Sequence, residues 1–169
     1  MAVRAFIPFP DKRLSVVCDQ VDAITDVERG IWRDMFDSMY DMPGVGLAAC
    51  QIGITRALAV VDAGDGKDKP VRMANPVILH ASAIMREHQE GSPNLPGVWA
   101  NLERPRGVTV GFMDEHGAQV ERDFVGLWAT SVQHQIDHLN GVMFFDRLSK
   151  TKRKMLISKA QKLSKKGLI

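Results

Sequence analysis

Two histidines four residues apart are the feature of this chain that points most directly to chemistry. They belong to the run His134-Gln135-Ile136-Asp137-His138. Side chains at this spacing project from one face of a helix, so both imidazoles can reach a single metal ion. In the metallohydrolase motif H-E-x-x-H, a Glu follows the first His and serves as general base. Here that residue is Gln135, whose amide cannot accept and return a proton near neutral pH.

Two further segments accompany the helix motif. Gly44 to Gln51 reads G-V-G-L-A-A-C-Q, and Glu90 to Asn94 reads E-G-S-P-N. With Q-H-Q-I-D-H-L-N-G from Gln133 to Gly141, they resemble in order and spacing the G-x-G-L-A-A-x-Q, E-G-C-L-S and Q-H-E-x-D-H-L-x-G motifs of the peptide deformylase family. The resemblance runs from about residue 8 to the C-terminus. It implies the deformylase fold and removal of the formyl group from the initiator methionine of nascent chains.

The chain departs from this pattern at the positions that carry the reaction. The resemblance implies one iron or zinc ion held by the two histidines and a Cys, but that Cys is Ser92 here, and a neutral hydroxyl is a poor ligand. Gln135 replaces the proton-transferring Glu, a contribution typically worth ~10²–10⁴-fold in rate. The resemblance also implies that the residue at position 93 and Gln51 each donate an N–H to an oxyanion. Pro93 has no backbone N–H, and the loss of one such donor lowers the rate roughly 10²–10³-fold.

These departures predict a deformylase-like protein with a degenerate site, holding no metal or only weakly bound zinc or iron. We expect it to bind rather than to hydrolyse, with peptide N-termini or the ribosome as partners. The alternative is a divergent metal-dependent hydrolase acting on formyl peptides or another amide, with Cys50, His88 or His116 recruited as third ligand. Equally, His134 and His138 could be core histidines without a metal.

The resemblance also implies a substrate pocket and the groups that support it. The pocket positions are Val45, Gly46, Leu47, His88, Trp99, Leu127, Thr130 and Ser131. Most of the matching positions in typical members are apolar, so His88, Thr130 and Ser131 predict a more polar ligand, or water. Trp99 stands where many bacterial members carry a substrate-contacting Arg. Glu90 and Arg104 match a structural ion pair, and Asp137 matches a carboxylate that orients the ligands.

The surrounding sequence indicates an α+β fold, with strands around a central helix that carries the histidines and with a helix near each terminus. Thr25 and Glu28 have capping-box spacing before an amphipathic helix that reaches about Tyr40. The other expected elements are a strand over 57–62, a polar loop from Gly64 to Lys69, strand-like sequence over 71–85 broken at Asn75-Pro76, a hairpin of 107–112 with 118–125, and helices over about 126–139 and 149–166. We expect residues 1–169 to form a single domain.

Charge is distributed unevenly along the chain. Residues 146–169 hold nine Lys/Arg and one acid, whereas the other 145 residues hold 13 basic and 19 acidic side chains. This basic C-terminal segment suggests an anionic partner such as ribosomal RNA, although a solvated helix face explains it equally well. With two cysteines, no long apolar stretch near the N-terminus and no run of 18 apolar residues, the chain is expected in the cytoplasm and not in a membrane.

Overall fold

The computed structural model describes residues 2–64 and 69–168. Its helices are α1 (Asp26–Asp41), α2 (Gly126–Leu139) and α3 (Lys150–Lys165), and its strands are β1 (Gly46–Ala48), β2 (Leu58–Val61), β3 (Val71–Ala81), β4 (Met85–Ser92), β5 (Leu95–Pro105), β6 (Gly107–Met113) and β7 (Gln119–Val125). Short 3-10 helices occupy η1 (Lys12–Ser15), η2 (Ala49–Ile52) and η3 (Phe144–Arg147). The loop expected from Gly64 to Lys69 lies mostly outside the described residues.

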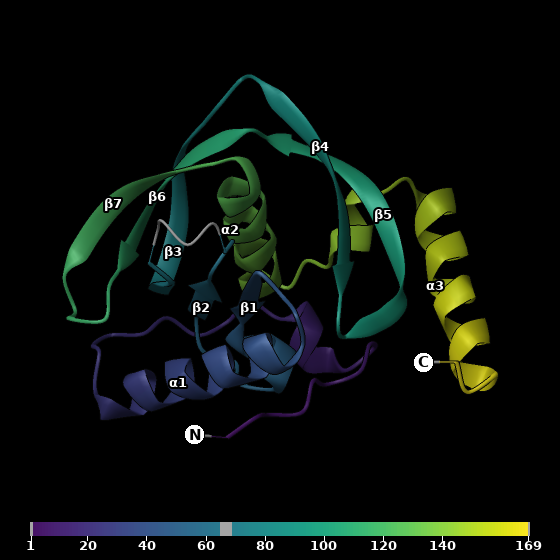
Figure 1. Cartoon of the computed structure of the whole chain (residues 1–169), viewed down its shortest axis with the longest axis horizontal. Coiled ribbons are helices and arrows are strands. Elements are labelled where there is room, and N and C mark those ends of the chain that lie inside the picture. The colour runs from purple at the N-terminus through teal and green to yellow at the C-terminus, as the bar shows by residue number, and fades with distance from the viewer. Residues whose placement is uncertain (1, 65–68, 169) are drawn as a thin grey trace.

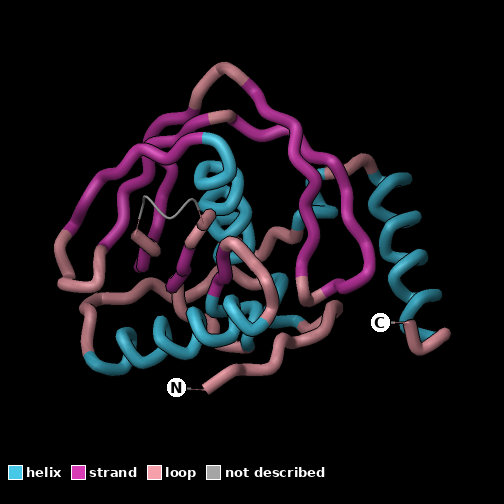
Figure 2. Tube along the Cα trace, viewed as in Figure 1, coloured by secondary structure: helices cyan, strands magenta, loops and turns pink. Residues whose placement is uncertain are grey.

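Helix α2 stands in the middle of the molecule, between two antiparallel sheets (Figures 1 and 2). In the described part of the chain, one sheet has the strand order β1-β2-β3-β6-β7, and the other is the hairpin β4-β5. Helix α1 lies below the larger sheet, and α3 lies beside β5 at the edge of the molecule. The α+β class predicted from sequence is confirmed, with antiparallel strands surrounding the histidine-bearing helix.

Strand β2 shows why the larger sheet is covered on both faces. All its residues are buried, and successive side chains point to opposite faces. Leu58 and Val60 pack with Trp32 in the cluster between α1 and the larger sheet. Ala59 packs in the cluster that contains the apolar residues of α2. The continuous apolar run of this strand, without polar alternation, is what burial on both faces requires.

The first helix has the capping box predicted from sequence. The Thr25 hydroxyl accepts the backbone N–H of Val27, and the Glu28 carboxylate accepts the backbone N–H of Thr25 at 2.9 Å. Glu28 is buried and also pairs with Arg56. Because these bonds satisfy free N–H groups of the first turn, they fix the start of α1 at Asp26.

The predicted break at Asn75-Pro76 is wrong. Strand β3 continues through it, with a shift of register against β6 between Ala74 and Val77. Asn75 has φ of 52°, and its side-chain amide exchanges two hydrogen bonds with the backbone of Val21, at 2.9 and 2.7 Å. The Asn-Pro pair therefore marks a bulge within a strand, because Asn tolerates the left-handed conformation that a bulge needs.

Strands β4 and β5 were not predicted as a hairpin. Residues 86–90 of β4 are all polar or charged, so the strand lacks the apolar alternation that reveals most strands. Strand β4 pairs with β5 in an antiparallel register in which Met85 lies opposite Pro105 and Glu90 lies opposite Ala100. The inward-facing side of this hairpin carries the residues of the candidate site.

The two C-terminal helices begin and end close to the expected positions. Helix α2 ends at Leu139, and Gly141 then adopts φ of 73° where a Cβ would lie 2.8 Å from the backbone of Ser15. Helix α3 is capped by Ser149 and packs through Leu156, Ile157 and Ala160 into the cluster that includes β5 and η3. Among the described residues, no helix has both the length and the apolar character needed to cross a bilayer.

Candidate functional site

A cleft of about 450 Å³ opens between α2, the hairpin β4-β5 and the loop that precedes β1. Seven of the eight predicted pocket residues line it: Val45, Gly46, His88, Trp99, Leu127, Thr130 and Ser131. The residues predicted for chemistry that line it with them are Gln51, Ser92, Pro93, His134 and Gln135. Segments distant in sequence are therefore brought together at one end of the central helix.

Leu47 is the predicted pocket residue that the structure places elsewhere. Its side chain is fully buried in the cluster between α1 and the larger sheet and is not part of the cleft wall. The reason is strand alternation, because Gly46 faces the cleft from β1 and the next residue must face the opposite side. Met42 and Pro43 line the cleft instead, in the loop that follows α1. Sequence patterns alone did not identify them.

The two histidines face each other one turn apart on α2. Their Nε2 atoms are 3.1 Å apart, and the Nδ1 of His134 is 2.8 Å from Oε2 of Glu90. Since a carboxylate only accepts, His134 donates to Glu90 through Nδ1–H, and a hydrogen bond joins its Nε2 to the Nε2 of His138. Burial, together with the electrostatic effect of His134 and Arg104, lowers the pKa of His138 well below its usual value. His138 is thus held as a neutral imidazole.

A buried charge network supports this pair from behind. Arg104 donates to both oxygens of Glu90, at 2.5 and 2.9 Å, and to Asp137 at 2.9 Å. Burial opposes ionisation of Glu90, but hydrogen bonds from Arg104 and His134 outweigh it and lower the pKa of Glu90 to about 2. Arg147 adds two hydrogen bonds to Asp137, at 2.6 and 2.5 Å. The ion pair expected between Glu90 and Arg104 is present.

The expected role of Asp137 differs from the observed one. Its carboxylate contacts Arg104 and Arg147, and in the described structure it is hydrogen-bonded to neither imidazole. The carboxylate that orients an imidazole is that of Glu90. Asp137 acts one step further away, by holding the guanidinium that holds Glu90.

Ser92 occupies the position of the third metal ligand implied by the resemblance. Its hydroxyl donates to Oδ1 of Asn94 at 3.0 Å and accepts the side-chain N–H of Gln51 at 3.4 Å. The donor set is therefore two imidazole nitrogens and a neutral, already engaged hydroxyl, which does not match a three-donor iron or zinc site. In residues 2–64 and 69–168, no group of three or more His, Cys, Asp or Glu side chains could hold a metal.

In the described structure, none of the three alternative third ligands forms a metal-binding group with the two histidines. Cys50 is fully buried in the core with Cys18, its Sγ–H donates to the backbone carbonyl of His138 at 3.3 Å, and its contact with Cys18 together with burial raises the pKa of its thiol. It behaves as a packed small residue of the core. His116 lies in the exposed turn between β6 and β7. His88 lines the cleft, with its Nδ1 buried and without a partner in the described structure.

Gln135 is buried against the glycine of β1. A Cβ at Gly46 would overlap Oγ of Ser131 and lie 2.7 Å from Nε2 of Gln135, so any larger residue here would displace these side chains. The Oε1 of Gln135 is buried and makes no hydrogen bond within the described residues. A Glu at position 135 would place a charged carboxylate in this buried site, whereas the amide of Gln135 leaves a neutral acceptor without a partner in the described structure.

The polar groups of the pocket are less free than their sequence suggests. The Thr130 hydroxyl donates to the carbonyl of Gly126 at 3.2 Å, and that of Ser131 donates to the carbonyl of Val45 at 2.9 Å. Their protons are thus used within the protein, and only their lone pairs face the cleft. Trp99 lies at the rim, 59% exposed, with its indole close above Gly91. The cleft combines an apolar rim with a polar floor that has few free donors.

Known proteins share the sequence pattern and the fold described above. A family model described as polypeptide deformylase matches residues 3–154. A peptide deformylase of Rhodopseudomonas palustris (strain TIE-1) is 45% identical over 172 residues, covering 99% of this chain and 98% of the relative, and one of Afipia carboxidovorans is 44% identical, covering 98% of each. The crystal structure of peptide deformylase from Ehrlichia chaffeensis has a TM-score of 0.90 at 31% identity, covering 99% of this chain and 100% of that one. That from Legionella pneumophila has 0.90 at 37%, covering 98% of each.

Proposed function

The chain belongs to the peptide deformylase family, and from this premise we propose that it binds peptide N-termini in its cleft without the hydrolysis of that family. The observation that carries the proposal is the state of Ser92. The hydroxyl at the third ligand position is neutral, and its proton is committed to Asn94 at 3.0 Å. Two imidazoles alone make a weak site for iron or zinc, which in proteins are held by three or four strong donors.

The proton-transfer position supports the same proposal. Gln135 lies next to His134 on α2 and lines the cleft, where a carboxylate could exchange protons with water and substrate. Its amide neither gains nor loses a proton near neutral pH, so no general base acts from this position.

Stabilisation of a developing oxyanion is weakened as well. Pro93 has no backbone N–H to direct at a carbonyl oxygen in the cleft. Metal, proton transfer and oxyanion stabilisation act as one unit in such a mechanism, so losses at each of them do not simply add. Any one of these changes could be tolerated in a slow enzyme, and the three together favour binding over turnover.

What the cleft retains is the ability to hold a small peptide end. Its volume of about 450 Å³ lies within the usual range of ligand sites. The exposed indole of Trp99 and the side chain of Val45 offer apolar contact at the rim, while Ser131 and Thr130 offer acceptors on the floor. An N-terminal residue with its first peptide groups matches this size and distribution.

The decisive experiment is metal content together with hydrolysis. Protein purified anaerobically without chelators is analysed by elemental mass spectrometry and then assayed on a formyl-methionyl peptide. We expect far less than one iron or zinc per chain and no turnover above the protein-free control. The matched variant is Ser92→Cys with Gln135→Glu, which should gain metal if the scaffold is intact. Efficient hydrolysis by the natural chain would overturn the proposal.

A divergent metal-dependent hydrolase is the second candidate. The observation in its favour is the facing Nε2 atoms of His134 and His138, held at 3.1 Å by the network through Glu90 and Arg104. This candidate requires stoichiometric metal in the natural chain and loss of any detected amide hydrolysis in His134→Ala. An unchanged activity in that variant would exclude it.

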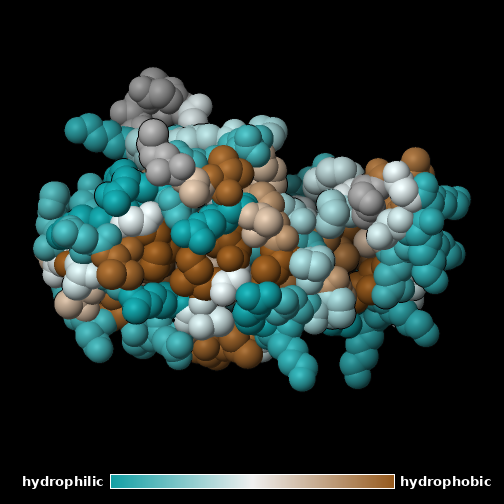
Figure 3. Space-filling model, turned by 90° about the horizontal axis from the view of Figure 1, so that it is seen from below, coloured by the Kyte–Doolittle hydropathy of each residue, from teal (hydrophilic) through white to brown (hydrophobic). Residues whose placement is uncertain are grey.

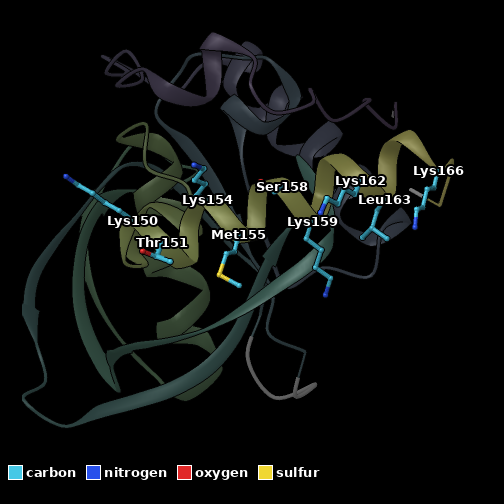
Figure 4. Close-up of a pocket in the computed structure, with 9 residues that line it drawn as sticks. All are labelled: Lys150, Thr151, Lys154, Met155, Ser158, Lys159, Lys162, Leu163 and Lys166. Atoms are coloured by element: carbon cyan, nitrogen blue, oxygen red, sulfur yellow. The ribbon is translucent and has the colours of Figure 1, made fainter.

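The second surface in the proposal is the basic face of α3. A groove of about 730 Å³ runs along this helix, lined by Lys150, Thr151, Lys154, Met155, Ser158, Lys159, Lys162, Leu163 and Lys166 (Figure 4). Seen from below, this end of the molecule is mostly hydrophilic, with long side chains that project from it (Figure 3). The groove has no aromatic side chain for base stacking, so it suits phosphate groups through charge alone.

We infer that α3 contacts ribosomal RNA, which would bring the cleft to nascent N-termini in the cytoplasm. Co-sedimentation with ribosomes should weaken steeply between about 50 and 200 mM salt. Replacing Lys154 and Lys162 by Glu should abolish it, while the exposed Lys12, far from α3 in sequence, provides a matched Lys→Glu control. Equal co-sedimentation of both variants would show that the helix is merely a solvated face.

A further inference from the structure

Asn94 links three parts of the chain at the wall of the cleft. It lies in the turn between β4 and β5 and is 1% exposed. Its Oδ1 accepts from Nε2 of Gln51 at 2.9 Å and from the hydroxyl of Ser92 at 3.0 Å. Its Nδ2 donates to the backbone carbonyls of Ile7 at 2.7 Å and Gln51 at 2.9 Å. Every polar atom of this side chain is therefore used.

These bonds engage the side chain of Gln51. Its Oε1 accepts the backbone N–H of Ala48 at 2.9 Å. Its Nε2 has two hydrogens and two acceptors, Oδ1 of Asn94 at 2.9 Å and Oγ of Ser92 at 3.4 Å. Although Gln51 lines the cleft, a ligand carbonyl would have to compete with these two acceptors for its N–H groups.

The backbone holds the arrangement in place. Phe9 donates its N–H to the carbonyl of Asn94 at 2.8 Å, and Ile7 donates its N–H to the carbonyl of Gln51 at 3.0 Å. To release the Gln51 amide, a ligand would have to break a buried hydrogen bond and leave the Asn94 acceptor without its partner. Exchanging one buried hydrogen bond for another gives little net gain.

We propose that Asn94 is a positioning residue that holds the Gln51 amide away from the ligand, so that the cleft does not recognise a carbonyl oxygen at the ligand's N-terminus. This inference rests on the proposed function, since it concerns the ligand of the same cleft. The backbone N–H at Pro93 is missing, the amide of Gln51 is engaged and the hydroxyl proton of Ser92 is given to Asn94. The ligand class is a peptide end recognised by its first side chain and chain direction, whether or not it carries a formyl group.

The first test measures recognition of the formyl group without any metal. Dissociation constants are measured for a methionyl peptide with and without its formyl group, on the natural chain and on Asn94→Ser. Releasing one hydrogen-bond donor in Asn94→Ser should raise the preference for the formyl peptide by about 3- to 10-fold relative to the natural chain. An unchanged preference in Asn94→Ser refutes the inference.

The second test separates this inference from the proposed function. One variant restores Ser92→Cys, Pro93→Leu and Gln135→Glu, and a second adds Asn94→Ser, the residue of the E-G-C-L-S motif. With metal content and melting temperature matched, the added change should raise kcat by about 10²-fold and leave KM almost unchanged. Equal kcat values refute the role of Asn94. Hydrolysis by the natural chain refutes the proposed function and leaves this comparison intact.

A measurement on the natural chain covers the case in which Asn94→Ser does not fold. In an NMR spectrum, the Gln51 side-chain NH₂ signals should be protected from hydrogen exchange and should not shift when a saturating formyl-methionyl peptide is added. A shift of these signals on binding, with faster exchange in the free protein, would show that Gln51 is available to the ligand.

Discussion

Replacing Arg104 with Met tests whether the buried charge network stabilises the fold as its geometry indicates. Arg104 is 3% exposed and makes three hydrogen bonds to Glu90 and Asp137, at 2.5 to 2.9 Å. Met keeps much of the volume but leaves the Glu90 carboxylate buried with only an imidazole partner. Breaking such a pair on one side costs about 3–5 kcal/mol.

The pKa of Glu90 supports a figure of the same size. Its folded value of about 2 lies some 2.5 units below the ordinary 4.5, which corresponds to roughly 3 kcal/mol. Because the folded pKa is the lower one, this contribution is fully present above about pH 4.5 and is lost as the pH falls through 2. In Arg104→Met, most of this stabilising contribution is lost at neutral pH, because the hydrogen bonds from Arg104 to Glu90 are absent.

Thermal unfolding followed by circular dichroism measures the effect. For 169 residues the entropy of unfolding is roughly 0.35 kcal/mol per kelvin, so a loss of 4 kcal/mol lowers Tm by about 10 °C. The matched control is Arg4→Met, which removes a similar two-bond pair with Asp34 from a half-exposed site and should cost no more than about 1 kcal/mol.

A double variant sharpens the test. Glu90→Gln combined with Arg104→Met removes both charges, so it should be more stable than the sum of the single losses predicts. A Tm for Arg104→Met within about 3 °C of the natural chain, equal to that of the surface control, would refute the reasoning. The network would then orient His134 without stabilising the fold.

Two further predictions concern other parts of the molecule. Tyr40 is the single tyrosine, and partial burial together with its hydrogen bond to Asp62 raises its pKa to about 12. Ultraviolet titration of the phenolate should therefore show one transition near that pH, moved toward the usual 10 by Asp62→Asn. Its stabilising contribution is present below pH 10 and is lost as the pH rises through 12; a transition near 10 in the natural chain would contradict this. Gly46→Ala should cost about 1–3 kcal/mol in denaturant unfolding, because its Cβ meets Ser131, whereas Gly30→Ala in the middle of α1 should gain up to about 1 kcal/mol. Equal effects of the two glycine changes would show that the contact at Gly46 relaxes freely.

The elements that local rules describe well were predicted well. The capping box at Thr25, the hairpin around residues 114–117 and the end of α2 at Asn140 each depend on a few adjacent residues. The shared face of the two central histidines followed from their spacing, because spacing along a helix fixes direction, whereas the pocket positions came from the family resemblance. Their assembly into one cleft followed from the family resemblance.

What the sequence did not reveal depends on contacts between distant segments. The polar strand β4 has no apolar alternation, since its inward face holds Glu90 against Arg104 and not against a hydrophobic core. The direction of Leu47 required the exact register of a three-residue strand. The role of Asn94 required the position of Ile7, which lies 87 residues away along the chain. No local pattern encodes such a bond.

The basic helix has a consequence for its own integrity. Lys150 and Lys154 lie one turn apart, as do Lys159 and Lys162, and the helix contains no acid to offset them. Each such like-charge pair opposes helix formation by a few tenths of a kcal/mol, and dissolved ions screen that repulsion. Rising salt therefore has two opposite effects on α3. It stabilises the helix by screening the repulsion between lysines, and it weakens the binding of phosphate groups. A polyanion that binds at low salt would also stabilise the helix, because it neutralises the same lysines that repel one another.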